Sequence, residues 1–206
     1  MIASILGQWL KFSEKDIRIL TISGLLHDIG KIMIPNEILT KPGKLTVAEY
    51  NIMKQHVNFG YEKVKNQNID IRIKEACLLH HEKCDGTGYP FGLKSDHIPA
   101  VAKIIAIADV YDAMTSARVY RGALCPFEVI DTMYKDAFTK FEPEYILPFL
   151  KNVASSYINN DVRLSDGRIG KVVLINENAL SLPIVQCEDE FIDLSKTREL
   201  TVSAIL

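Results

Sequence analysis

The sequence lacks long apolar runs and the start of a secretory signal. Its longest mostly apolar stretch, residues 100–114, contains Lys103, Asp109 and Asp112, whereas a membrane-spanning helix needs about 20 apolar residues. The amino-terminal segment MIASILGQWLKF has no basic start of the kind that opens a signal peptide. We therefore expect no membrane insertion and a cytoplasmic location.

The sequence also lacks a high cysteine content and an excess of charge of one sign. The four cysteines show no CxxC spacing, which favours reduced thiols. Acidic and basic residues nearly balance, at 26 and 24, for a net charge of −2. This balance excludes the basic footprint of a protein that binds long nucleic acid. It allows a small phosphate-bearing ligand, because a few well-placed cations hold one without changing the overall charge.

Residues 1–155 have the pattern of a series of helices. Ser13 and Thr46 each precede an acidic residue by three positions, which is typical of helix starts. Residues 82–98 contain three glycines and a proline and predict a long loop. Loops of this length inside a compact domain are usually functional. A further helix is expected over residues 99–116, and two more helices follow it.

The pattern changes at Asp161. Asp166-Gly167 is a hairpin signal between the segments VRL and KVVLI, and short strand-like runs continue to the end of the chain. A segment of about 46 residues is too short to bury a core of its own, so we expect it to pack on the helices or on another chain. The predicted fold is mostly α, with a helical domain over residues 1–155 and a small β-strand domain over residues 156–206.

Histidines and carboxylates recur together in the predicted helices and suggest a metal site. Adjacent residues of a helix point about 100° apart, so His27-Asp28 and His80-His81 suit two or more metals that share ligands. Imidazoles and carboxylates without cysteine favour iron or manganese. Asp28 and Asp109 also lie in apolar segments of the sequence, where a buried charge without a partner would be costly. The candidate ligands are His27, Asp28, His56, His80, His81 and Asp109.

Helical spacing predicts the surroundings of two candidate site residues, His56 and Lys31. A single histidine in a helix is more often a packed side chain than a ligand. We expect His56 to share a helix face with Ile52 and Phe59, which agrees with that structural interpretation. Lys31 stands four residues after His27, so its cation is expected near any anion that the metals hold.

Four segments occur in the order of a known family. They are LLHDIGKIMIP, KQH, LLHHEKCDGTGYPFGL and IIAIADVYDAMTSARVYR. Together they resemble the motif set of the HD-GYP family, phosphodiesterases of the second messenger cyclic di-GMP within the HD phosphohydrolase superfamily. The likeness covers about residues 3–140. The His-Asp pair alone would indicate only the superfamily, whereas His-His-Glu followed by Asp-Gly-x-Gly-Tyr-Pro is far more specific.

The resemblance implies an HD-type helical bundle and a role for each motif residue. It implies that the six candidate ligands hold two or three divalent ions, and that Asp28 bridges two of them. It implies that Lys31 and Asp28 take part in catalysis. The residues implied to contact the substrate are Lys31, Gly88, Tyr89, Asp112, Arg118 and Arg121. Asp112 is alternatively a partner of Lys31 or a further ligand.

The implied activity is hydrolysis of cyclic di-GMP to linear pGpG and, in some family members, to GMP. Family members usually carry another ligand histidine, and some carry a glutamate shortly before it, on the helix before the one that contains His27. This chain opens inside that helix, and no His or Glu precedes Glu14. Two alternatives therefore stay open: an inactive receptor that binds cyclic di-GMP, and an HD phosphohydrolase of another nucleotide. A homodimer or an upstream sensor domain is the further partner that we expect.

Overall fold

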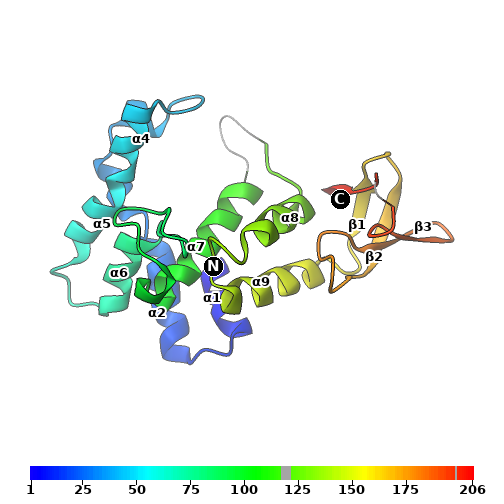
Figure 1. Cartoon of the computed structure of the whole chain (residues 1–206), viewed down its shortest axis with the longest axis horizontal. Coiled ribbons are helices and arrows are strands. Elements are labelled where there is room, and N and C mark those ends of the chain that lie inside the picture. The colour runs from blue at the N-terminus through cyan, green and yellow to red at the C-terminus, as the bar shows by residue number, and fades with distance from the viewer. Residues whose placement is uncertain (117–121, 198) are drawn as a thin grey trace.

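The computed structural model describes residues 1–116, 122–197 and 199–206, in which a helical region is followed by an antiparallel sheet (Figure 1). This confirms the predicted mostly α fold with a small β region at the carboxyl end. The α-helices are α1 (Ile2–Trp9), α2 (Glu14–Leu26), α3 (Asn36–Leu39), α4 (Val47–Lys54), α5 (His56–Val64), α6 (Ile71–Leu79), α7 (Ala100–Thr115), α8 (Pro126–Asp136) and α9 (Pro143–Ser156). Two 3-10 helices accompany them, η1 (Ile29–Met33) and η2 (Ser95–His97).

The predicted helix starts are borne out by their caps. The Ser13 hydroxyl accepts a hydrogen bond from the Asp16 N–H at the start of α2. Thr46 and Glu49 exchange two such bonds and form a complete capping box at α4. Each cap satisfies N–H groups that the first helical turn leaves without partners.

The prediction of one helix through Ile52, His56 and Phe59 is wrong. The chain divides at Gln55, which ends α4 and begins α5. After this break His56 is only 1% exposed, whereas Ile52 is 42% and Phe59 is 36% exposed. His56 is therefore buried, whereas Ile52 and Phe59 are exposed to solvent. The backbone of His56 packs against Gly30 of η1, and this tertiary contact outweighs the continuous helical periodicity of the sequence.

Helix α7 lies in the middle of the helical region and carries much of its core. It packs against α1, α2, α6, α8 and α9. Ala102, Ile104 and Ile107 on this helix have no measurable exposure. Burial of side chains on more than one face explains why α7 is apolar around most of its circumference. None of the helices in the described residues is long and apolar enough to cross a membrane.

The sheet consists of neighbouring antiparallel strands in the order β4-β3-β2-β1-β5. The strands are β1 (Asp161–Leu164), β2 (Ile169–Leu174), β3 (Ile184–Cys187), β4 (Glu190–Asp193) and β5 (Val202–Ile205). Gly167, with φ of 93°, lies in the predicted turn between β1 and β2. The buried faces of β1 and β2 belong to the same hydrophobic core as α8 and α9. The sheet thus packs on the helices, while the division into two domains stays a prediction.

Candidate metal centre

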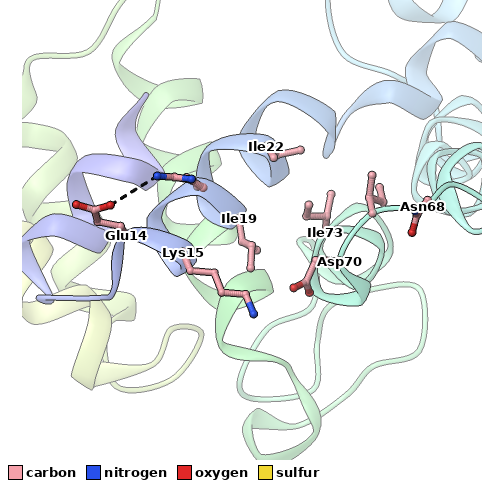
Figure 2. Close-up of a pocket in the computed structure, with 9 residues that line it drawn as sticks. Glu14, Lys15, Ile19, Ile22, Asn68, Asp70 and Ile73 are labelled. Atoms are coloured by element: carbon pink, nitrogen blue, oxygen red, sulfur yellow. Dashed lines mark ion pairs between the residues drawn. The ribbon is translucent and has the colours of Figure 1, made fainter.

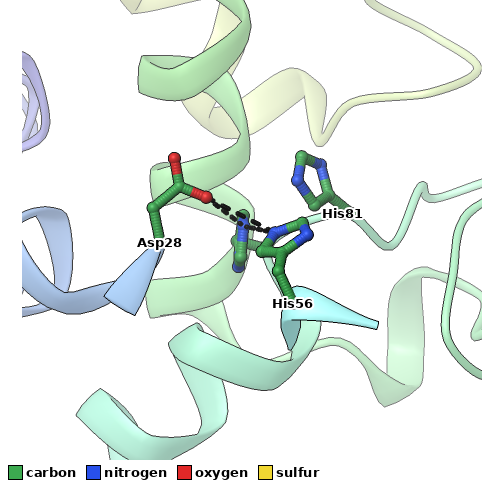
Figure 3. A group of neighbouring side chains, drawn as sticks. Asp28, His56 and His81 are labelled. Atoms are coloured by element: carbon green, nitrogen blue, oxygen red, sulfur yellow. Dashed lines mark hydrogen bonds and ion pairs between the residues drawn. The ribbon is translucent and has the colours of Figure 1, made fainter. Parts of the chain in front are cut away.

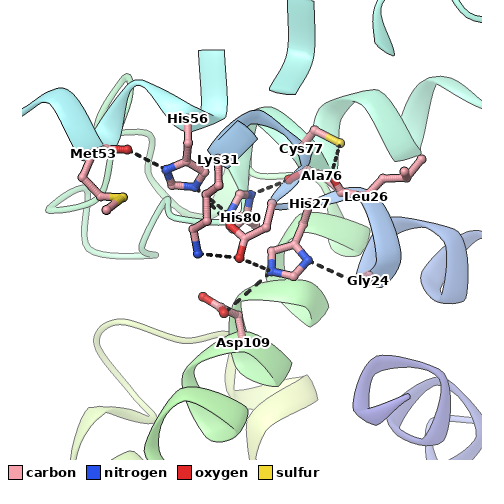
Figure 4. Close-up of polar contacts among 11 residues, drawn as sticks. Gly24, Leu26, His27, Lys31, Met53, His56, Ala76, Cys77, His80 and Asp109 are labelled. Atoms are coloured by element: carbon pink, nitrogen blue, oxygen red, sulfur yellow. Dashed lines mark hydrogen bonds and ion pairs between the residues drawn. The ribbon is translucent and has the colours of Figure 1, made fainter. Parts of the chain in front are cut away.

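The six candidate ligands come together from four parts of the helical region. His27 ends α2 and Asp28 opens η1. His56 opens α5, and His80 ends α6 with His81 directly after it. Asp109 projects from α7 toward the same place (Figure 4). The predicted convergence of imidazoles and carboxylates is therefore present in the fold.

Asp28 belongs to two groups of ligand atoms. Its Oδ1 lies 3.4 Å from His56 Nε2 and 3.9 Å from His80 Nε2, and His81 completes this group (Figure 3). His27 Nε2 lies 3.4 Å from Asp28 Oδ2 and 3.7 Å from Asp109 Oδ1, which forms the second group. Within each group the ligand atoms all lie within 4.8 Å of one another.

Three of the imidazoles are oriented by backbone carbonyls. The Nδ1 atoms of His27, His56 and His80 lie 2.8–2.9 Å from the carbonyl oxygens of Gly24, Met53 and Ala76 (Figure 4). A carbonyl only accepts, so each Nδ1 must carry the proton. In the neutral ring, each Nε2 then has a lone pair that faces the centre of the site, the usual arrangement of histidines that bind a metal.

Two polar atoms of the site are buried without a partner. Among the described residues, neither His27 Nε2 nor Asp28 Oδ1 finds a hydrogen bond. Unsatisfied buried polar atoms are costly, and a cation between these ligands would satisfy both. The donor set, imidazole nitrogens with carboxylate oxygens, also fits a divalent transition metal. The residues present thus suit a bound metal ion.

Burial keeps most of the histidines neutral. It lowers the pKa of His56 and His80, and lowers that of His81 to about 4. Neutral imidazole is the form that binds a metal. For His27, burial acts in the same direction, but the carboxylates of Asp109 and Asp28 outweigh it and raise the pKa to about 10. Without a metal, His27 therefore carries a proton that a cation would replace.

Lys31 lies beside Asp28 rather than on α2. Because α2 ends at Leu26, the helical spacing from His27 does not apply. Lys31 follows in η1, where its Nζ donates to Asp28 Oδ2 (Figure 4). Its side chain is 37% exposed. The ammonium group is thus at the solvent side of the site, within reach of an incoming anion.

Tyr89 and Gly88 fix the loop beside the histidines. The Tyr89 ring stacks on His81 with ring centroids 4.7 Å apart and an interplanar angle of 27°. Tyr50 on α4 meets the Tyr89 ring edge to face at 6.5 Å. A Cβ on Gly88 would lie 2.5 Å from the Cα of Glu82, so only glycine fits there. Both residues therefore shape the wall of the site next to His81.

The other residues predicted to contact the substrate are Asp112, Arg118 and Arg121, and the structure describes only the first of them. Asp112 is exposed, one turn after Asp109 on α7, and belongs to neither ligand group of the described residues. Arg118 and Arg121 lie outside the described residues. Their proposed contacts with substrate stay predictions.

Sequence reasoning missed Gly30. A Cβ at this position would lie 1.9 Å from the His56 carbonyl oxygen and 2.4 Å from the Gly60 nitrogen. Only glycine lets η1 approach α5 so closely, and this approach brings Asp28 beside His56. The signal in the sequence was the glycine two residues after Asp28, where no turn was expected.

A groove of about 550 Å³ lies apart from the metal site, between α2 and the start of α6 (Figure 2). The ion pair of Glu14 and Arg18 borders it, with 3.6 Å between the charged atoms, and Ile22 and Ile73 supply apolar walls. None of its described lining residues belongs to either ligand group. The groove therefore does not extend the metal site.

Comparisons with known proteins identify similar chains. The model of the family described as "HD domain" matches residues 1–145. The cyclic di-GMP phosphodiesterase response regulator RpfG of Xanthomonas campestris is 41% identical over 155 residues, which cover 74% of this chain and 41% of the relative. The 3′3′-cGAMP-specific phosphodiesterase 1 of Vibrio cholerae is 44% identical over 117 residues, 55% of this chain and 26% of the relative. The chain thus spans less than half the length of these curated relatives.

A solved structure supports the fold. Bd1817, an HDG"Y"P protein from Bdellovibrio bacteriovorus, superposes with a TM-score of 0.59 at 23% sequence identity. The match covers 71% of this chain and 47% of the other.

Proposed function

This chain belongs to the HD domain family, and we propose that it is a metal-dependent phosphodiesterase that hydrolyses cyclic di-GMP to pGpG and on to GMP. The predicted membership in the HD-GYP group is confirmed by its relatives. One observation carries the proposal: the two oxygens of Asp28 face different histidines, and Oδ2 also accepts from Lys31. A carboxylate that could serve two ions, with the Lys31 ammonium group beside it, suits an anionic phosphodiester.

The metal ions are part of this proposal. His56, His80 and His81 with Asp28 would hold one ion, and His27, Asp28 and Asp109 would hold another. We propose iron or manganese, in two or three positions, because imidazole and carboxylate ligands suit both metals. When bound, such ions lower the pKa of a bound water and draw charge from a phosphodiester.

The chain's own residues contribute orientation and charge. The backbone carbonyls fix three imidazoles before any ligand arrives, so little is lost in reorganisation. Lys31 can leave Asp28 for a phosphate oxygen of the substrate, because its ammonium group is partly exposed. Tyr89 covers one face of His81 and limits the access of bulk water to that ligand. We propose that Arg118 and Arg121 add further cations for the second phosphate.

The direct test is product formation. Protein loaded with manganese or ferrous iron is incubated with cyclic di-GMP, and pGpG and GMP are separated by chromatography. Asp109→Asn, which removes a ligand charge, is expected to lower the rate about 100-fold or more. Asp96→Asn serves as its matched control, because Asp96 is exposed and outside both ligand groups. An absence of product with either metal, in a preparation shown to hold that metal, would refute the proposal.

Cyclic GMP-AMP is the second candidate substrate, because a relative of 44% identity is specific for it. Parallel measurements of kcat/KM with the two dinucleotides decide between them. Calorimetry on the same samples tests the receptor alternative: binding of cyclic di-GMP without any product would support a receptor instead of an enzyme.

A further inference from the structure

Glu82 is buried beside the metal site without belonging to it. Its residue exposure is only 4%. Its Oε1 accepts from the Phe91 N–H at 2.7 Å, and its Oε2 accepts from the Leu93 N–H at 2.9 Å. Both oxygens of this carboxylate thus bind the backbone of the loop that contains Gly88-Tyr89-Pro90.

The same loop is held from its other side. The Tyr89 N–H donates to the His81 carbonyl oxygen at 3.2 Å. Gly88 packs directly on the Glu82 backbone, where a Cβ would not fit. Residues 88–93 therefore fold back on residues 81–83, and the Tyr89 ring lies against the His81 imidazole.

His81 needs this support more than the other imidazoles of the site. His27, His56 and His80 each donate to a backbone carbonyl. In the part of the chain that the structure describes, no hydrogen bond is found for the His81 ring. Its ring contacts are with Tyr89 at 4.7 Å, His80 at 4.2 Å and His56 at 5.1 Å between ring centroids.

We propose that Glu82 is a positioning residue: it holds the 88–93 loop so that the Tyr89 ring fixes the orientation of His81 toward the metal. The inference rests on the proposed function, because His81 acts as a ligand there. Glu82 belongs to neither ligand group of the described residues, and its carboxylate binds the loop backbone instead. The stack with Tyr89 replaces the backbone acceptor that the other three histidines have.

Glu82→Gln is the sharpest variant. It keeps the size of the side chain but turns one of its two acceptors into an amide NH₂ that faces a backbone N–H. That N–H loses its partner, and a buried unpaired donor is costly. Amide exchange at Phe91 and Leu93 is expected to accelerate. Glu62→Gln, the same chemical change at an exposed position on α5, is expected to leave exchange unchanged.

The affinity for Mn²⁺ alone, measured by calorimetry on metal-free protein, tests the effect on His81. Loss of a group that orients a ligand typically costs about tenfold or more in metal affinity. We expect that loss in Glu82→Gln and in Tyr89→Leu, and no loss in Tyr89→Phe, which keeps the ring. The double variant Glu82→Gln/Tyr89→Leu is expected to lose no more than Tyr89→Leu, because both changes act on one contact.

Three outcomes would overturn this role of Glu82. The first is wild-type Mn²⁺ affinity in Glu82→Gln, and the second is wild-type affinity in Tyr89→Leu, which decides even when Glu82→Gln does not fold. The third is a double variant whose loss equals the product of the two single losses. None of these measurements needs turnover, so failure of the proposed phosphodiesterase activity is distinguished from failure of this inference.

Discussion

His27 differs from the other imidazoles of the site in what surrounds it. His56, His80 and His81 are neutral because burial dominates, whereas Asp28 and Asp109 hold a proton on His27. The sequence alone did not predict which histidines are neutral and which is protonated. These states follow from which carboxylate each ring faces, and this depends on the tertiary fold.

The metal-free protein is therefore expected to lose stability at alkaline pH. The pKa of His27 rises from its ordinary 6.5 to about 10 in the folded state. Its contribution to the free energy of unfolding is complete below pH 6.5 and is lost as the pH rises through about 10. Urea denaturation of chelator-treated protein between these values should show the decline.

Two variants complete that measurement. His27→Gln should remove the decline, and His97→Gln should keep it, because His97 is an exposed residue of η2 beside Asp96. An equal decline in His27→Gln would contradict the assignment of the proton to His27.

Gly30 allows η1 to lie directly against the α5 backbone. Gly30→Ala should lower the free energy of unfolding by about 2–3 kcal/mol, because the added methyl group overlaps the α5 backbone rather than a movable side chain. It should also reduce Mn²⁺ affinity, since Asp28 and His56 would separate. Chemical denaturation and calorimetry check both effects.

Gly24→Ala provides the control for Gly30→Ala. Gly24 lies inside α2, where a Cβ would meet only Ile105 and Ala3 at ordinary contact distances. Alanine is the better helix former by up to about 1 kcal/mol, so this variant should be neutral or more stable. A comparable loss in both variants would show that the close contact with α5 is not the cause.

Individual elements show where sequence reasoning succeeds. The starts of α2, α4, α8 and α9 were predictable, because caps and first-turn prolines are local signals. The break at Gln55 was not, since it depends on the contact between α5 and η1. The ligand residues could be identified from the motifs, but the bond from Glu82 to the loop and the fit of Gly30 appear only in three dimensions.

The capping box at α4 gives a prediction for this element. Thr46→Ala should cost about 1 kcal/mol of stability, because the Glu49 N–H loses its acceptor at the helix start. Urea denaturation gives the value. Thr132→Ala on α8 is the matched control, since the Thr132 hydroxyl only donates a hydrogen bond to the Glu128 carbonyl oxygen within the helix. A loss of equal size at Thr132 would argue against the capping effect.

Among the described residues, the larger of the two hydrophobic clusters joins the helical region to the sheet. Buried residues of the helices and of all five strands, β1 to β5, form this cluster, in which Val162 has no measurable exposure. The sequence indicated that the strands must pack on something, because so short a segment buries little by itself. The sequence did not indicate against which helices the strands would pack.

Val162→Ala is expected to destabilise the helices together with the sheet. The variant leaves a cavity in the shared core and should lower the melting temperature of the helical signal, with a loss of about 1–3 kcal/mol. Circular dichroism and calorimetry should then report one transition. Two separate transitions, with the helical one unchanged, would instead favour independent domains for residues 1–155 and 156–206.

The ligands of the candidate metal centre come from segments far apart in the chain: α2 with η1, α5, α6 and α7. The complete ligand set exists only when these segments have docked on one another, so binding of an ion would favour the docked state. Once captured, the ion would act as a cross-link across long loops and oppose their opening. The supply of metal in the cell would then govern how long each molecule survives proteolysis.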